Sequence, residues 1–270
     1  MSYFKNKTAI VTGSGMGIGK AIALELCKAG ANVVLNGRNA DRLEKTYQEF
    51  LQKGYPVVAV QGDVTKISDC SMIIQKAIDT FDNLDILVTN AGISMRERFE
   101  NLQPEVFSQI IESNINGSAF PALTALPHLK KTKGSIVFIS SAAGMIGLPT
   151  ASAYSAGKMA LTALAQSLKI EMASSGVHIG IVHVGFTQND IEKRVLNATG
   201  DLVPVASRPA YLQQTQEQVA KAVLSTIRKR RFKVVLTLVG KINAFVVRFF
   251  PSLVIRIVTV SQKKMEKMYK

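Results

Sequence analysis

Six short apolar runs, separated by longer segments with helical spacing, recur along the chain. Apolar residues follow one another without polar alternation, as in buried parallel strands, at 8–13, 32–37, 56–63, 84–92, 135–141 and 177–185. The intervening segments repeat apolar residues every three or four positions, at 18–28, 40–52, 67–81, 104–131, 152–173 and 216–229, and a last strand is expected at 232–238. This alternation predicts an α/β fold, a doubly wound, mostly parallel sheet (Rossmann fold) with helices on both faces.

The chain is expected to form one domain. Its length of 270 residues and the lack of a Pro-, Gly- or Ser-rich linker favour a single unit at 1–240, including a substrate loop at about 186–214. A basic, apolar helical extension is expected at 241–270. The first residues run directly into a strand, so we expect no signal peptide. Cys27 and Cys70 are expected to be buried thiols in a reducing compartment.

The turn after the first strand is rich in glycine. Gly13, Gly17 and Gly19 are candidates for a tight turn, a close approach of the backbone to a pyrophosphate, and packing of helix on strand. The next helix would offer free N–H groups and its positive dipole end to that negative charge. The alternative is that these glycines serve the turn alone.

The end of the second strand indicates which dinucleotide would bind. An acid there would bind the ribose hydroxyls of NAD, but the chain has Asn36, Gly37 and Arg38. A guanidinium can grip a 2′-phosphate bidentately, which favours NADP(H) over NAD(H). An exposed arginine at a strand end is the alternative. Asp63 ends the third strand, where it could accept from the adenine amino group, and 89–92 (TNAG) ends the fourth.

Tyr154 and Lys158 stand one helical turn apart, shortly after Ser141. Reduction of a ketone by hydride needs a proton donor for the developing alkoxide, and an ammonium beside the phenol would lower its pKa. Ser141 would hydrogen-bond the substrate carbonyl. Asn114 is predicted to break a helix locally and anchor a water that connects Lys158 to solvent. A surface tyrosine is the alternative meaning of such a pair.

These motifs resemble the short-chain dehydrogenase/reductase family over roughly residues 5–240. The resemblance implies a seven-stranded parallel sheet, transfer of the 4-pro-S hydride, and a homodimer or homotetramer formed through the helices at 104–131 and 152–173. It also implies the catalytic residues Asn114, Ser141, Tyr154 and Lys158. The implied cofactor-binding residues are Gly13, Ser14, Gly17, Ile18, Gly19, Arg38, Asp63, Val64, Asn90, Ala91, Gly92, Tyr154, Lys158, Gly185 and Thr187.

The chain departs from the family pattern in two places. After the sixth strand Val184 replaces a common proline, and Asn189 stands where a threonine is common, with Thr187 two residues earlier. The contact with the nicotinamide carboxamide is therefore open. Met16 stands where many NADP-preferring members have a basic residue in the glycine turn, which leaves Arg38 as the main phosphate ligand.

The net charge of +14 is concentrated near the C-terminal end. The last fifty residues hold thirteen of the 33 Lys and Arg but only one of the 19 acidic residues. Lys241, Arg248, Arg256 and Lys263 or Lys264 recur every seven or eight residues, so they would share one face of a helix. The uncharged runs between them are too short to span a bilayer.

Several interpretations of this extension stay open. An apolar face beside a row of cations suits a helix lying in an anionic membrane interface. Equally, the apolar face could pack on the domain or on a second subunit while the cations are solvated. An acidic protein partner is a third interpretation. We expect no nucleic acid, because no binding module is present.

The sequence therefore predicts an NADPH-dependent reductase (or reverse dehydrogenase) of a ketone or secondary alcohol on an apolar, lipid-like substrate such as 3-ketosphinganine or a steroid. One alternative is a 3-oxoacyl-[acyl-carrier-protein] reductase. Another is a non-catalytic nucleotide-binding scaffold, which would be free to lose Ser141, Tyr154 or Lys158. We expect no metal, because none of the three histidines has ligand spacing. The expected location is cytoplasmic, with peripheral contact at the inner face of a membrane left open.

Overall fold

The computed structural model describes residues 3–188, 190, 192–205 and 213–269, with the side chains of all of these except 238, 239, 243 and 261–269. A seven-stranded sheet with the order β3-β2-β1-β4-β5-β6-β9 runs through it, and every neighbouring pair is parallel. Its strands are β1 (Thr8–Val11), β2 (Asn32–Gly37), β3 (Val57–Gln61), β4 (Ile86–Thr89), β5 (Ser135–Ser141), β6 (His178–Val184) and β9 (Lys233–Val235). The predicted doubly wound α/β fold is confirmed.

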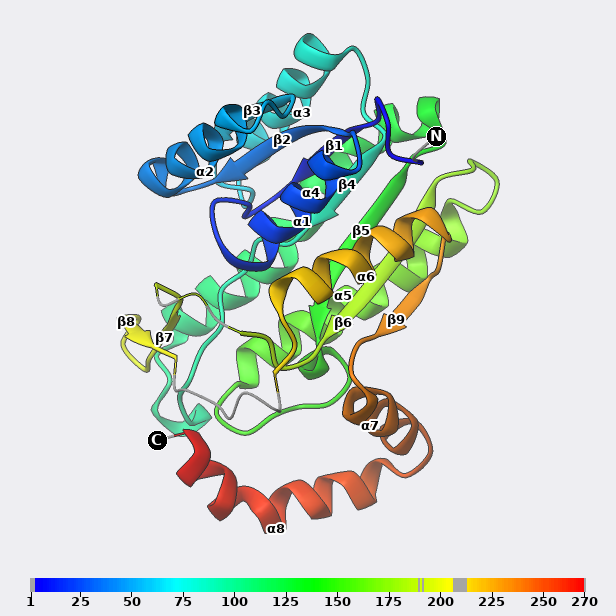
Figure 1. Ribbon diagram of the computed structural model, residues 1–270. Coiled ribbons are helices and arrows are strands. Elements are labelled where there is room, and N and C mark those ends of the chain that lie inside the picture. The colour runs from blue at the N-terminus through cyan, green and yellow to red at the C-terminus, as the bar shows by residue number, and fades with distance from the viewer. Residues whose placement is uncertain (1–2, 189, 191, 206–212, 270) are drawn as a thin grey trace.

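Helices cover both faces of this sheet (Figure 1). On one face, α1 (Gly17–Lys28), α2 (Ala40–Gln52) and α6 (Gln216–Arg228) enclose one apolar core with the strands. On the other, α3 (Ile67–Phe81), α4 (Pro104–Thr132) and α5 (Ser152–Glu171) enclose a second core. Because both faces are buried, β1, β4 and β6 are buried along their whole length, which explains their unalternated apolar sequences.

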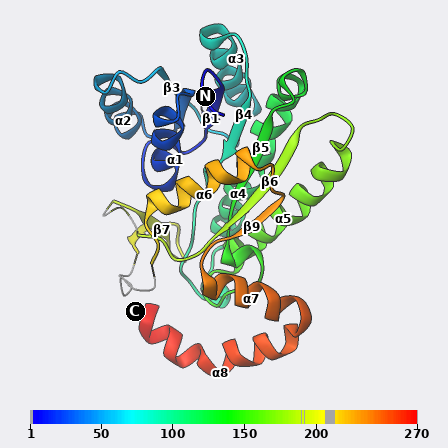
Figure 2. The ribbon, with the colours of Figure 1, turned by 45° about the vertical axis from the view of Figure 1, so that its right-hand side comes forward.

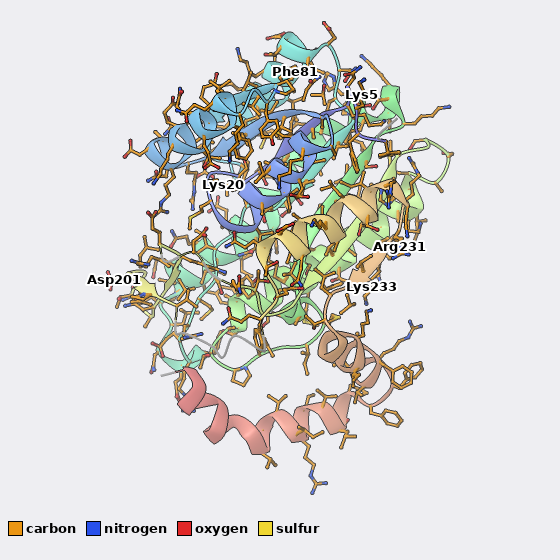
Figure 3. The ribbon with its side chains drawn as sticks, in the orientation of Figure 1. Lys5, Lys20, Phe81, Asp201, Arg231 and Lys233 are labelled. Carbon is orange, nitrogen blue, oxygen red and sulfur yellow. The ribbon has the colours of Figure 1, made fainter. Side chains whose placement is uncertain are left out.

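The segment after β6 differs from the featureless loop that we expected. Two short antiparallel strands, β7 (Arg194–Leu196) and β8 (Leu202–Pro204), form a hairpin there. Figure 3 shows Asp201 at its outer end. The rest of the predicted substrate loop is described only in part, and Asn189 lies outside the described residues.

The last strand is shorter than predicted. β9 ends at Val235, and Thr237 takes a left-handed backbone conformation with φ 66° before the next helix begins. The chain leaves the parallel strand β9 at the carboxyl edge of the sheet, so the helices that follow lie on that edge. These helices are α7 (Leu238–Phe249) and α8 (Pro251–Tyr269), which together form the extension.

In both ribbon views the extension projects from the domain as a curved arm (Figures 1 and 2). The break between its helices falls just before Pro251, because a proline cannot continue α7. Every described side chain from 251 to 260 is exposed or half-buried. Among the helices whose residues the structure describes, none combines the length and the apolar content that a bilayer crossing requires.

Candidate active site

A cleft of about 570 Å³ opens at the carboxyl edge of the sheet, where ligands bind in open α/β folds. The ends of β1, β4, β5 and β6 meet there, and α5 adds side chains from its first turns. The predicted residues that line the cleft are Gly13, Gly17, Ile18, Arg38, Asp63, Val64, Asn90, Ala91, Gly92, Asn114, Ser141, Tyr154, Lys158, Gly185 and Thr187. The fold thus brings together residues from across the sequence.

Two of the predicted cofactor residues lie behind the glycine turn and do not line the cleft. Ser14 is fully buried, and its Oγ accepts a hydrogen bond from the backbone N–H of Asn36 at 2.9 Å. It therefore ties the turn to β2. A β carbon on Gly19 would collide with the carbonyl group of Gly13, so this glycine allows α1 to pack against the turn.

The glycine turn borders the cleft, and Asp190 Oδ2 lies close to it, 3.4 Å from where a β carbon on Gly17 would be. Gly13 and Gly17 have φ values of 63° and 61°, which favour glycine. Met16, at the N-cap of α1, supplies no capping hydrogen bond from its side chain. The first N–H groups of α1 can therefore bind an anion at the positive end of the helix dipole. These features fit a dinucleotide.

Thr12 organises the floor of this site, and the sequence analysis missed it. Its Oγ1 accepts hydrogen bonds at 3.0 Å from the backbone N–H groups of Asn90 and Ala91. In return, Asn90 Nδ2 donates to the carbonyl oxygens of Thr12 and Gly13 at 3.0 and 3.1 Å. The ends of β1 and β4 are thereby clamped together. Only its place before the first glycine could have pointed to Thr12.

Tyr154 and Ser141 meet in the cleft through a side-chain hydrogen bond. Burial raises the pKa of Tyr154 above its ordinary value, and the hydrogen bond with Ser141 opposes this shift. We expected the pKa of the phenol to be lowered. It is raised because removal from water disfavours the phenolate more than the contacts in this structure favour it. Tyr154 is therefore held as a protonated phenol.

Lys158 lies one turn below Tyr154 and is almost completely buried, with 5% of its surface exposed. Its Nζ donates a hydrogen bond to the carbonyl oxygen of Ile139 at 3.0 Å and lies 5.7 Å from the centre of the Tyr154 ring. Burial, helped by the charge of Lys193, lowers the pKa of Lys158 to about 8.

Asn114 lies inside α4, which runs through it without the break that we predicted. Its Nδ2 donates to the carbonyl oxygens of Ile93 at 2.7 Å and Ile110 at 2.9 Å, so the side chain supports the helix instead of interrupting it. Among the described residues, none hydrogen-bonds to the buried Oδ1 of Asn114. A β carbon on Gly92 would lie 2.6 Å from this oxygen. The oxygen is thus placed to accept from a polar group in the cleft.

Beside the ends of β2 and β3, Arg38 and Asp63 form an ion pair with Nη1 3.7 Å from Oδ2. Burial tends to raise the pKa of Asp63, but hydrogen bonds from Thr65 and the charges of Arg38 and Lys66 keep it below its usual value. Asp63 Oδ1 is engaged by the backbone N–H and hydroxyl of Thr65 at 3.0 and 2.9 Å. Arg38 therefore has a carboxylate neighbour that the sequence analysis did not foresee.

Two residues at or just after the end of β6 make further contacts. Thr187 Oγ1 donates to the carbonyl oxygen of Gly185 at 3.2 Å and accepts from Gln214 Nε2 at 3.2 Å, which fixes this side of the cleft. His183, which the sequence analysis did not select, lies 3.1 Å from the carbonyl oxygen of Ser141 through Nδ1. Burial lowers the pKa of His183 to about 4, so it is a neutral support for the strand end that carries Ser141.

Residues 7–199 match the short chain dehydrogenase family. This match covers more than half of the chain, and the chain belongs to the short-chain dehydrogenase/reductase family. The sequence resemblance to this family is confirmed, and its fold is one that binds nicotinamide cofactors.

Among curated proteins, the chain is 38% identical over 194 residues to 11-beta-hydroxysteroid dehydrogenase-like 2 of Arabidopsis thaliana, covering 70% of this chain. The chain spans only 63% of the length of that relative. It is 36% identical over 228 residues to the 11-beta-hydroxysteroid dehydrogenase-like 4A of the same plant, covering 82% of this chain and 73% of the relative.

Solved structures show the same fold. A dehydrogenase/reductase from Sinorhizobium meliloti 1021 is 27% identical with a TM-score of 0.74, covering 86% of this chain and 94% of its own. An alcohol dehydrogenase from Thermococcus sibiricus, complexed with 5-hydroxy-NADP, is 27% identical with a TM-score of 0.73, covering 85% and 95%. A Burkholderia phymatum family member in complex with NAD is 19% identical with a TM-score of 0.75, covering 100% and 98%, and shows the fold alone.

Proposed function

We propose that this protein is an NADPH-dependent reductase of a ketone on an apolar, lipid-like substrate. The hydrogen-bonded pair of Tyr154 and Ser141 beside the buried Lys158, in the same cleft as the glycine turn, carries this proposal. The cofactor, when bound, would supply hydride to the carbonyl carbon. A non-catalytic scaffold would not need a proton donor (Tyr154) and a carbonyl-binding hydroxyl (Ser141) side by side in the cleft.

Each residue of this site has a separate task. The Ser141 hydroxyl donates a hydrogen bond to the ketone oxygen and fixes its position. Tyr154 then transfers its phenolic proton to that oxygen as negative charge develops there. The Lys158 ammonium stabilises the phenolate that remains, and the free Oδ1 of Asn114 accepts from a water that returns a proton.

NADP(H) is the proposed cofactor because Arg38 borders the adenosine end of the cleft and the end of β2 has Asn36, Gly37 and Arg38 with no acid that would select NAD. Asn36 is committed to the fold, since its Nδ2 donates to the carbonyl oxygens of Val60 and Gly62 at 3.1 and 3.2 Å. The ion pair with Asp63 tempers the positive charge of Arg38 without removing it. A phosphate dianion would compete well with one carboxylate.

Apolar side chains support a lipid-like substrate. Those that line the cleft beyond Tyr154 include Met95, Leu148, Val195 and Leu202. Two relatives are named for 11-beta-hydroxysteroids, which is in keeping with a steroid or a sphingoid ketone such as 3-ketosphinganine. A substrate on an acidic carrier protein is the alternative, and the basic side chains of Arg96, Lys193 and Arg194 that line the cleft would suit it.

NADPH oxidation against a panel of ketones tests this proposal. We expect turnover of a steroid or sphingoid ketone and at least tenfold lower kcat/KM for 3-oxoacyl groups on a carrier protein. The reverse ranking would replace the lipid-like substrate by the carrier-protein substrate. Binding of NADPH with no turnover of any ketone would favour the scaffold.

We further propose that the protein is a homo-oligomer and that α7 and α8 contact an anionic membrane peripherally, at its inner face. Exposed apolar side chains gather on these helices: Ile242, Phe245, Phe249, Phe250, Leu253 and Val260. Ile242, Phe245 and Phe249 share one face of α7 by their spacing. Lys241, Arg248 and Arg256 are exposed beside them, as an interfacial helix requires.

Flotation with lipid vesicles tests the membrane contact. The protein should float with vesicles that contain phosphatidylserine and much less with pure phosphatidylcholine. Changing Phe245 and Phe249 to Ser should abolish flotation, whereas the matched change of exposed Leu51 and Met72 to Ser should not. Equal flotation of both double variants would exclude docking through α7.

A further inference from the structure

Arg42 lines the same cleft as Arg38. It lies in the first turn of α2, and its backbone N–H is held at 2.8 Å by the side chain of Asn39, the N-cap residue. Its Nη1 lies 3.5 Å from the Sδ of Met16 in the glycine turn. The guanidinium of Arg42 therefore lies beside the glycine turn. It places a positive charge next to Met16, which has none.

The second neighbour of Arg42 comes from the segment after β6. Arg42 Nε lies 2.9 Å from Oε2 of Glu192, across 150 residues of sequence. Both side chains are substantially exposed, so the pair holds the segment only weakly. The same segment has a second anchor, since Gln216 Nε2 donates to Oδ1 of Asp190 at 3.2 Å.

We propose that Arg42 is a second ligand of the adenosine 2′-phosphate, and that NADPH exchanges its ion pair with Glu192 for a pair with that phosphate. The inference rests on the proposed preference for NADP(H). Two arginines, each paired with one carboxylate, border one end of the cleft. A phosphate carries nearly two negative charges and accepts bidentate hydrogen bonds, so it competes better for a guanidinium than an exposed carboxylate does.

The exchange would connect cofactor choice with the substrate side of the cleft. NADH has no 2′-phosphate and would leave the pair of Arg42 and Glu192 intact. NADPH would release Glu192, and the segment that leads into β7 would lose this contact with α2. The cation at the N-terminus of α2 also adds to the positive end of that helix dipole, which favours an anion there.

Binding of the fragments 2′,5′-ADP and 5′-AMP tests the ligand role without any turnover. Arg42→Gln should weaken binding of 2′,5′-ADP roughly 10- to 100-fold and leave 5′-AMP within about twofold. Lys45→Gln, which removes an exposed charge from the same helix outside the cleft, is the matched control. Arg42→Lys should fall between, because it keeps the charge and loses the planar fork. Equal binding by Arg42→Gln and Lys45→Gln would overturn the proposal.

The proposed exchange of the Arg42–Glu192 ion pair for a pair with the phosphate can be tested separately. Glu192→Gln removes the competing charge, so it should tighten 2′,5′-ADP binding by about twofold to fivefold. In the wild-type protein, 2′,5′-ADP should speed hydrogen exchange of the amides at 192–196, and 5′-AMP should not. An unchanged affinity in Glu192→Gln together with unchanged exchange would remove the coupling.

The outcomes separate this inference from the proposed function. If wild-type protein binds 2′,5′-ADP no better than 5′-AMP, the preference for NADP(H) and the role of Arg42 both fall. If it prefers 2′,5′-ADP and Arg42→Gln keeps that preference, only the role of Arg42 falls.

Discussion

The ammonium nitrogen of Lys158 donates a hydrogen bond to the carbonyl oxygen of Ile139 at 3.0 Å, on the strand that carries Ser141. Lys158 belongs to α5, so this contact joins the helix that carries Tyr154 to the strand that carries Ser141. The burial that the contact requires also weakens the hold of Lys158 on its proton, since it lowers the pKa to about 8. One side chain therefore sets both the geometry and the pH range of the site.

The pH dependence of reduction follows from this pKa. Lys158 keeps its charge below about pH 8 and loses it as the pH rises through that value. Tyr154 stays protonated over this range, because burial raises its pKa. We expect kcat/KM for ketone reduction to fall above about pH 8. Lys193→Gln should move the fall to higher pH by removing a like charge, and Lys130→Gln should not. A flat profile from pH 7 to 10 would contradict this role of Lys158.

Arg38→Asp should invert the cofactor preference. A carboxylate at this position would repel a 2′-phosphate and sit beside Asp63, so the Kd for NADPH should rise about 100-fold. The Kd for NADH should change less than threefold. Fluorescence titration of both cofactors measures this, with Arg228→Asp on the exposed part of α6 as the control. An unchanged ratio of the two Kd values would dismiss Arg38 as a phosphate ligand.

Gly92→Ala should damage catalysis through Asn114. The added β carbon would lie 2.6 Å from Asn114 Oδ1, so the Asn114 side chain must shift, whereas Lys158 Nζ at 3.4 Å would be in ordinary contact. Misplacement on this scale should lower kcat by about 100-fold. Gly147→Ala is the matched control, because nothing lies within 4 Å of its added carbon. Equal kcat values for the two variants would show that the position of Asn114 is unimportant.

The proposed oligomer should depend on the outer sides of α4 and α5. Leu123 and Met159 are 62% and 45% exposed on these helices. Changing both to Glu should shift the protein toward the monomer in size-exclusion chromatography with light scattering. The same change at Leu51 should leave the assembly intact. An unaltered mass for the double variant would place the interface elsewhere.

Much of the fold could be predicted from the sequence, because a sheet buried on both faces leaves uninterrupted apolar runs. The predicted helices at 40–52 and 67–81 coincide with α2 and α3, since both have a strong apolar face and clear ends. The hairpin of β7 and β8 was missed. Its strands have three residues each, which is too few to show the alternation of apolar and polar residues that marks a strand.

The sequence indicated which residues make up the site, but it did not indicate many of the contacts between them. Local spacing places Tyr154 and Lys158 on one face of α5, but it cannot reveal that Lys158 reaches the backbone of β5. Likewise, the pair of Arg42 and Glu192 spans 150 residues and depends on how the segment after β6 crosses the cleft. Asn114 was expected to break α4 because asparagine competes for backbone hydrogen bonds. Instead its amide bonds the carbonyl groups of Ile93 and Ile110, and the helix continues.

The most direct test of a phenol acting as proton donor compares wild-type protein with Tyr154→Phe. NADPH affinity should change less than threefold, while the rate of ketone reduction in a single turnover should fall at least about 1,000-fold. A single-turnover rate in Tyr154→Phe close to that of the wild-type protein would contradict the central claim that Tyr154 protonates the substrate oxygen.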